Sequence, residues 1–225
     1  MPAQSTEPRA VLWDMDGTLL DSAEYHWLSW REALAREGHV MTRDRFDATF
    51  GRRNDAILRE LLGEDVLPET IVRIAAAKEE RYRELAQAGG IEPLPGVRAW
   101  LARLKAAGWR QAVASSAPRL NIAAILEAMG LEPFFDAVAA DDDVQRGKPD
   151  PQVFLVAAAK LGVPPARCVV VEDAPAGLEG ARRAGMRRIG LATSHAELDA
   201  DIVVRSLEDL PLDAFDRLLD EPSVG

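Results

Sequence analysis

The 225-residue sequence has a single cysteine and no apolar run long enough to span a bilayer. A lone cysteine excludes an internal disulfide framework and fits a reducing cytosol. Cys168 lies in the apolar run CVVVED without a basic neighbour, so we expect a buried core residue rather than a nucleophile. The first ten residues, MPAQSTEPRA, lack the basic start and apolar core of a signal peptide. Together these absences predict a cytoplasmic protein.

Positive charge is also in short supply. There are 27 lysines and arginines against 37 aspartates and glutamates, which gives a formal net charge of −10. Nucleic acids and anionic membranes bind basic surfaces, so neither is expected as a partner. A small anion held in a local positive pocket is compatible with this balance. The sequence shows no low-complexity tract and no internal repeat, and we expect a monomer or a weak oligomer.

Short apolar runs alternate with helical stretches, a pattern typical of an α/β fold with a parallel sheet. Six strands are predicted, at residues 10–14, 110–115, 137–140, 168–173, 187–192 and 201–204. Helices that fill the intervals are predicted at 97–107, 119–129, 151–161, 175–184 and 206–219. The expected architecture is a doubly wound parallel sheet with helices on both faces.

One interval breaks this alternation. Almost a hundred residues separate the first two predicted strands, and most of them are helical in pattern, at about 23–37, 43–49, 54–63 and 68–88. The segment AGGIEPLPG, residues 88–96, has the glycine and proline density of a linker. We therefore predict a helical cap domain over 20–90, inserted into a catalytic core made of 1–19 and 91–225.

Four predicted strands end in polar residues of a consistent kind. In open α/β sheets, ligands bind at the carboxyl ends of the strands, so these residues are expected to converge. Carboxylates are the ligands that Mg²⁺ prefers, while lysine and hydroxyl groups hold phosphoryl oxygens. The pattern therefore predicts a site for Mg²⁺ and a phosphoryl group. The residues are Asp14, Asp16, Ser115, Ser116, Lys148, Glu172 and Asp173.

Each piece alone has a structural explanation. Asp16-Gly17-Thr18 could form a tight turn, and Ser115 or Ser116 could cap the following helix. Lys148 before a proline could be a solvated loop residue. Their occurrence in this order, each at the end of a predicted strand, favours the functional interpretation.

The motifs DMDGT, SS after a strand, GKPDP and VVVEDAPAG resemble the four motifs of the haloacid dehalogenase superfamily of phosphotransferases. The resemblance covers essentially the whole chain and implies a Rossmann-like core with a helical cap inserted after the first strand. It implies that Asp14 is the nucleophile that becomes an aspartyl-phosphate and that Asp16 is the general acid and base. Ser115 would bind the transferring phosphoryl group, and Lys148 would stabilise the nucleophile.

The same resemblance implies the cofactor. Asp14, the backbone carbonyl of Asp16, and Asp173 would hold Mg²⁺, with Glu172 in the ligand shell or just behind it. Gly17, Thr18 and Ser116 are predicted to contact the substrate. Because Asp16 is retained, dehalogenation and phosphonate cleavage are not expected. The alternative of a non-catalytic phosphate-binding protein predicts a damaged site, whereas all these residues are present.

The cap leaves two reactions open. The segment DSAEYHWLSWREALAREG, residues 21–38, resembles the first cap segment of β-phosphoglucomutases, including His26 and Trp30, which share a helix face. Lys78 lies within an apolar stripe, where it is either a snorkelling lysine or, as in that subfamily, a substrate contact. These features favour a phosphohexomutase of the β-phosphoglucomutase type.

Two other features favour hydrolysis. That mutase commonly has valine after the Asp-Gly pair. This chain has Thr18 there, as many phosphatases do. In the cap loop FGRRNDAIL, Gly51 fits the mutase pattern, but the position of its phosphate-binding arginine is Asn54, which leaves Arg52 or Arg53 to compensate. We therefore predict a Mg²⁺-dependent phosphatase that acts on a small phosphorylated metabolite, a sugar phosphate, with the mutase as the alternative.

Overall fold

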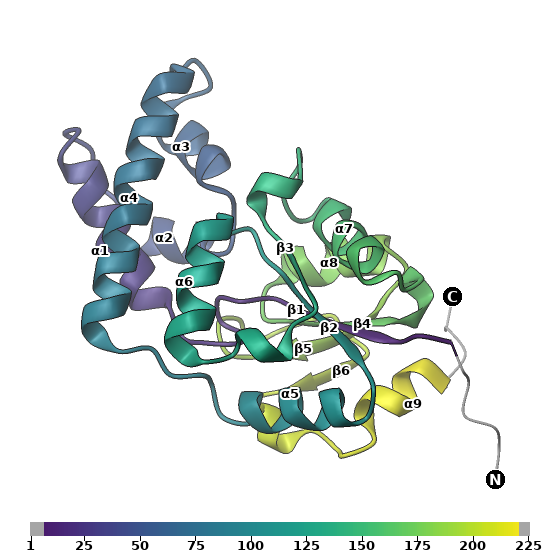
Figure 1. Ribbon diagram of the computed structural model, residues 1–225. Helices are drawn as coiled ribbons and strands as arrows, with labels where there is room; N and C mark the ends of the chain where they lie inside the picture. The colour runs from purple at the N-terminus through teal and green to yellow at the C-terminus, as the bar shows by residue number, and fades with distance from the viewer. Residues whose placement is uncertain (1–6, 221–225) are drawn as a thin grey trace, which may run out of the picture.

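Strand β1 (Ala10–Trp13) lies in the middle of a six-stranded parallel sheet in the computed structural model, which describes residues 7–220 (Figure 1). The strand order is β3-β2-β1-β4-β5-β6, so the chain builds outward from β1 on one side and then on the other. The other strands are β2 (Arg110–Ala114), β3 (Ala137–Ala139), β4 (Cys168–Glu172), β5 (Arg187–Leu191) and β6 (Ile202–Val204). This confirms the predicted doubly wound parallel sheet.

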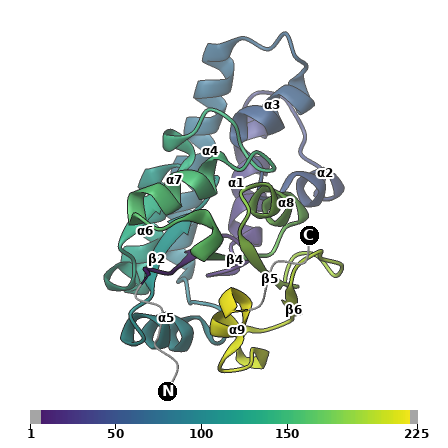
Figure 2. The ribbon, with the colours of Figure 1, turned by 90° about the vertical axis from the view of Figure 1, so that its right-hand side faces the viewer.

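Side chains along β1 alternate between two apolar layers, as the pleat of a strand requires. Val11 and Trp13 join one cluster, and Ala10 and Leu12 join the other. Helices on both faces complete these layers (Figures 1 and 2). The first face is covered by α5 (Val97–Ala106), α6 (Arg119–Met129) and α9 (Ala214–Asp220), and the second by α7 (Gln152–Leu161) and α8 (Pro175–Arg183).

Four helices follow β1 before the chain returns to the sheet. They are α1 (Ala23–Ala35), α2 (Arg43–Thr49), α3 (Asn54–Leu62) and α4 (Pro68–Gly89). Their apolar faces form a cluster of their own, which includes Trp30, Phe46, Leu58 and Ile74. In Figure 1 they stand together as a group beside the carboxyl end of the sheet. A helical cap after the first strand is therefore present, while the division into 1–19, 20–90 and 91–225 stays a prediction.

The predicted bounds agree with the structure to within two residues for every strand and for all helices but one. The helix predicted over 206–219 is wrong in its first part: a 3₁₀ turn at Leu207–Asp209 and a loop precede α9. Pro211 cannot donate a backbone hydrogen bond, and the Ser206 hydroxyl accepts from the Glu208 N–H, so a short capped turn replaces a continuous helix.

The prediction for the lone cysteine is confirmed. Cys168 is buried in β4, where burial raises the pKa of its thiol to about 12 and removes the thiolate that a nucleophile needs. No helix between residues 7 and 220 is long and apolar enough to cross a membrane.

Candidate active site

Backbone hydrogen bonds between neighbouring strands hold the first polar residue that follows β1 and the first that follows β2. Asp14 follows β1, and its N–H donates to the carbonyl oxygen of Val171 in β4 at 3.0 Å. Ser115 follows β2, and its N–H donates to the carbonyl oxygen of Ala139 at 3.0 Å. Hydrogen bonding therefore continues one residue beyond each strand. This fixes Asp14 and Ser115 at the carboxyl edge of the sheet.

Lys148 links two of the carboxylates at this edge. Its Nζ lies 2.5 Å from Oδ1 of Asp14 and 3.2 Å from Oε2 of Glu172. The lysine side chain is only 5% exposed, so water screens neither ion pair. The solvated loop lysine considered from the sequence is therefore excluded.

Burial and mutual repulsion disfavour the charged form of the carboxylates. Burial and the nearby Asp16 together raise the pKa of Asp14 more than Lys148 lowers it. Burial and the nearby Asp14 raise the pKa of Glu172 well above its ordinary value and that of Asp173 to about 7. Lys148 shows the opposite effect: despite burial, the charges of Asp14 and Glu172 raise its pKa. The site thus holds more carboxylates than one lysine can keep ionised.

This donor set fits a divalent cation. Oxygen atoms of Asp14, Glu172 and Asp173 all lie within 4.8 Å of one another, and all three residues are buried. Mg²⁺ favours such hard oxygen ligands and would neutralise the excess charge. Two glycines make room for the carboxylates: a side chain at Gly17, which has a φ of 82°, would overlap Asp173, and one at Gly177 would overlap Glu172. The residues present therefore fit the predicted Mg²⁺.

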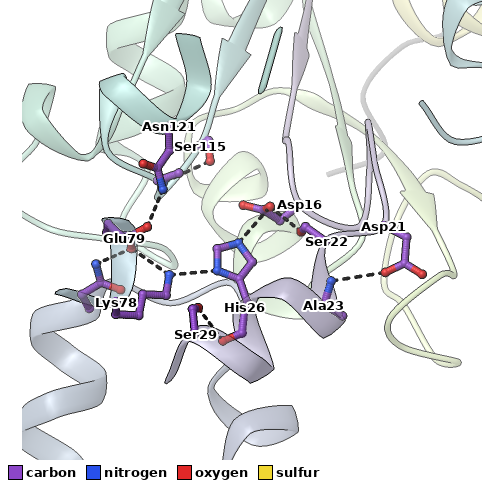
Figure 3. A network of polar contacts seen from close by, with 12 residues as sticks. Asp16, Asp21, Ser22, Ala23, His26, Ser29, Lys78, Glu79, Ser115 and Asn121 are labelled. Atoms are coloured by element: carbon purple, nitrogen blue, oxygen red, sulfur yellow. Dashed lines mark hydrogen bonds and ion pairs between the residues drawn. The ribbon is translucent and has the colours of Figure 1, made fainter. Parts of the chain in front are cut away.

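Asp16 faces the cap rather than this cluster. Its Oδ1 accepts from the Ser22 hydroxyl at 2.5 Å and lies 3.1 Å from Nε2 of His26 on α1 (Figure 3). Although burial opposes ionisation, His26 and Ser22 hold the pKa of Asp16 below its ordinary value. The two aspartates of the motif thus occupy different environments, one beside the lysine and one beneath the cap.

The position of Lys78 fixes the tautomer of His26. Nζ of Lys78 lies 2.8 Å from Nδ1 of His26, and an ammonium group can only donate, so Nδ1 accepts. The ring proton is then on Nε2, which donates to Asp16. The imidazole also stacks on Tyr82, with ring centroids 4.0 Å apart. This chain of contacts connects Asp16 to the cap helix α4.

One cavity contains most of the predicted site residues. It lies between the carboxyl edge of the sheet and the cap, and its walls also include the apolar side chains of Phe50 and Ile57. His26 and Trp30 line it together, as their spacing on one helix face predicts. The predicted residues in its walls are Asp14, Asp16, His26, Trp30, Gly51, Arg52, Asn54, Lys78, Ser115 and Ser116.

Three residues predicted to contact the substrate do not line this cavity. Gly17 borders a neighbouring cavity, and Thr18 is fully buried with no hydrogen-bond partner for its hydroxyl. Arg53 turns toward the core, where its Nε lies 2.8 Å from Asp141 and its Nη1 donates to the Val144 carbonyl at 3.1 Å. Their substrate contacts stay predictions without support from this geometry.

Three residues of the polar network were not predicted: Ser22, Glu79 and Asn121. Glu79 follows Lys78 on α4, and its Oε1 lies 2.7 Å from the lysine Nζ. Its Oε2 accepts from the Asn121 amide on core helix α6 (Figure 3). An acid beside a lysine in a helical stripe is the only signal that the sequence offers for Glu79, and acid–lysine neighbours are common on solvated helices.

Comparison with known proteins defines the class. A profile of haloacid dehalogenase-like hydrolases matches residues 8–185, so the chain belongs to this family. The chain is 34% identical over 216 residues to β-phosphoglucomutase from Bacillus subtilis, covering 91% of this chain and 92% of that protein. It is 37% identical over 183 residues to fructose-1-phosphate phosphatase from Escherichia coli, covering 78% of this chain and 92% of that protein.

A solved structure shares both the core and the cap. It is a variant of CbbY from Rhodobacter sphaeroides in complex with xylulose-1,5-bisphosphate, with a TM-score of 0.83 and 32% identity. The match covers 92% of this chain and 99% of that one. The predicted superfamily, its subfamily near β-phosphoglucomutase and the inserted helical cap are therefore confirmed.

Proposed function

We propose that the protein is a Mg²⁺-dependent phosphatase that hydrolyses a small sugar phosphate through an aspartyl-phosphate on Asp14. The observation that carries this proposal is the arrangement of two aspartates at one cavity. Asp14 lies beside Lys148 and the carboxylate cluster, while Asp16 is held by hydrogen bonds from His26 and Ser22. Such a pair can divide nucleophilic attack and proton transfer between two carboxylates.

In the first step, a carboxylate oxygen of Asp14 attacks phosphorus and the bond from phosphorus to the sugar oxygen breaks. For this step Asp16 must carry a proton, which its lowered pKa opposes. Its Oδ2, which takes part in neither of the two hydrogen bonds, can carry that proton and give it to the leaving oxygen. Lys148, at 2.5 Å from Asp14, partly neutralises the carboxylate as the anionic phosphate approaches. Bound Mg²⁺ would supply further screening of the repulsion between nucleophile and phosphate. Ser115 and Ser116 line the cavity next to Asp14 and are placed to donate to phosphoryl oxygens.

In the second step, water attacks phosphorus and the bond to Asp14 breaks. Asp16 is now a carboxylate and takes the proton of the attacking water. The two hydrogen bonds that Asp16 accepts favour this ionised form and orient its oxygens. The cap residues above the cavity limit access of other nucleophiles to the intermediate.

A phosphohexomutase of the β-phosphoglucomutase type is the second candidate. It is favoured by the identity to the Bacillus subtilis mutase and by the contacts that Lys78 and His26 make above Asp16. Hydrolysis is favoured by Asn54, which brings no positive charge to the cap loop, and by the identity to the Escherichia coli phosphatase.

One assay separates these candidates. The protein is incubated with Mg²⁺ and a panel of sugar phosphates, including fructose 1-phosphate and β-glucose 1-phosphate primed with glucose 1,6-bisphosphate. Inorganic phosphate and glucose 6-phosphate are followed together. Release of phosphate without glucose 6-phosphate supports the phosphatase, and glucose 6-phosphate formation without net phosphate release supports the mutase. No turnover on any phosphomonoester supports the non-catalytic alternative.

A further inference from the structure

Glu79 is a buried carboxylate in the cap wall of the active-site cavity, and the reaction steps above do not use it. Only 7% of the residue is exposed, and it lines the same cavity as Asp14 and Asp16. Its Oε1 accepts from Lys78 Nζ and from Asn54 Nδ2, each at 2.7 Å. A buried acid in the wall of a phosphate-binding cavity works against binding an anion there. Its position therefore has a consequence for the choice of substrate.

The residues that line the cap side of the cavity carry no net positive charge. The ammonium group of Lys78 is paired with Glu79, and Arg52 is paired with Glu60 on α3, with Nη1 2.7 Å from Oε2. His26 is neutral in the tautomer that Lys78 imposes. Within the described cavity wall, each cation above Asp16 thus has a carboxylate partner. Although burial opposes ionisation, Lys78 and the hydrogen bond from Asn54 hold the pKa of Glu79 below its ordinary value, so this acid stays charged.

A second phosphoryl group would bring about two further negative charges into this neutral wall. It would compete with Glu79 for Lys78 and would face the Glu79 carboxylate itself. A hydroxyl group meets no such repulsion. A carboxylate can accept about four hydrogen bonds, and Glu79 accepts from Lys78, Asn54 and Asn121. One acceptor position is left for a hydroxyl of the leaving group.

We propose that Glu79 is a specificity-determining residue that selects phosphomonoesters with an uncharged, hydroxylated leaving group and rejects sugar bisphosphates. This inference rests on the proposed phosphatase function and narrows its substrate class. It assigns the two walls of the cavity different tasks. The core edge, which is the carboxyl edge of the sheet with Asp14 and Ser115, binds the phosphoryl group. The cap wall, which includes Lys78 and Glu79, excludes a second phosphoryl group.

The test compares pairs of substrates that differ by one phosphoryl group. The pairs are fructose 1-phosphate with fructose 1,6-bisphosphate, and glucose 1-phosphate with glucose 1,6-bisphosphate. We expect wild-type kcat/KM to favour the monophosphate in the pair that is hydrolysed. In Glu79→Gln, that preference should fall about tenfold or more, mainly through a lower KM for the bisphosphate, because the repelling charge is gone while the side-chain shape is kept.

Two further variants make the comparison specific. Glu80→Gln changes the net charge by the same amount, but Glu80 is exposed on α4 outside the cavity, so the preference should stay at the wild-type value. Asn54→Arg adds a cation at the cavity wall without breaking the buried Lys78–Glu79 pair. It should also weaken the preference, and it carries the test if Glu79→Gln does not fold.

Three results would overturn the inference alone: equal wild-type use of both members of a pair, an equal shift in Glu80→Gln and Glu79→Gln, or an unchanged preference in both cavity variants. If wild-type protein with Mg²⁺ hydrolyses no sugar phosphate, the proposed function fails and this inference fails with it. The two failures are therefore distinguishable.

Discussion

A buried lysine lies on each side of the site, Lys148 beside Asp14 at the carboxyl edge of the sheet and Lys78 in the cap wall of the cavity, but their charges are balanced differently. At the core edge, Lys148 stands among three carboxylates, and the pKa of Asp173 rises to about 7. At the cap wall, Lys78 has one carboxylate partner, Glu79, and a neutral histidine. The excess of carboxylates at the core edge favours a bound cation and supplies the nucleophile, whereas the balanced charge of the cap wall can discriminate between substrates. Substitutions on the two sides of the site should therefore have unequal effects.

The largest effect is expected at the core edge, in Asp14→Asn. The amide has nearly the same shape but is not a nucleophile, so kcat/KM should fall by roughly four orders of magnitude or more. Circular dichroism should show an unchanged fold. Turnover near the wild-type rate in a folded variant would refute the role proposed for Asp14.

The two buried lysines provide a matched pair for the next test. In Lys148→Met, the buried carboxylates of Asp14 and Glu172 lose their lysine partner, so kcat should fall about a hundredfold or more, and stability to urea should fall by about 3–5 kcal/mol. In Lys78→Met, Lys148 still lies beside Asp14, so KM should change more than kcat. If the two variants lose kcat equally, the proposed division between chemistry and recognition is wrong.

A smaller effect is expected at the contact between the two regions. His26→Phe keeps a ring to stack on Tyr82 but removes one of the two hydrogen bonds to Asp16, so kcat should fall about tenfold. His26→Gln can restore an N–H donor and should recover part of that loss. Equal rates in the two variants would show that the hydrogen bond to Asp16 does not matter for turnover.

The smallest effect concerns metal and pH. In the folded state the pKa of Asp173 is raised from its ordinary value near 4 to about 7. Burial of Asp173 therefore costs no folding free energy below about pH 4, and the cost grows as the pH rises from about 4 to about 7. Stability without metal should therefore fall as pH rises through this range. Mg²⁺ competes with these protons, so millimolar Mg²⁺ should raise Tm by a few degrees more at about pH 8 than at about pH 5. An equal gain at both values would argue against these carboxylates as ligands.

The core edge was predictable from the sequence because strand ends bring distant motifs together. Asp14, Lys148 and Glu172 are far apart in the chain, yet parallel strands place their ends at one edge. The same regularity predicted the bounds of the strands. It did not extend to residues 206–213, where Pro211 and the Ser206 cap outweigh the helical pattern.

The cap wall was predictable only in part. Helical spacing placed His26 and Trp30 on one face, and both line the cavity. Glu79 and Asn121 meet across the gap between α4 and α6, which no local pattern encodes. Arg53 has the charge that a phosphate contact needs, but its ion pair with Asp141 takes it away from the cavity. Contacts between the cap and the core depend on how surfaces from distant parts of the chain meet, and periodicity carries no information on that.

The stereochemical course at phosphorus shows whether the phosphoryl group passes through Asp14. A sugar monophosphate made chiral with oxygen isotopes is hydrolysed with Mg²⁺ in isotopically labelled water, and the configuration of the released phosphate is determined. Attack by Asp14 and then by water inverts phosphorus twice, so net retention is expected. Net inversion would show direct attack by water and would contradict an aspartyl-phosphate on Asp14.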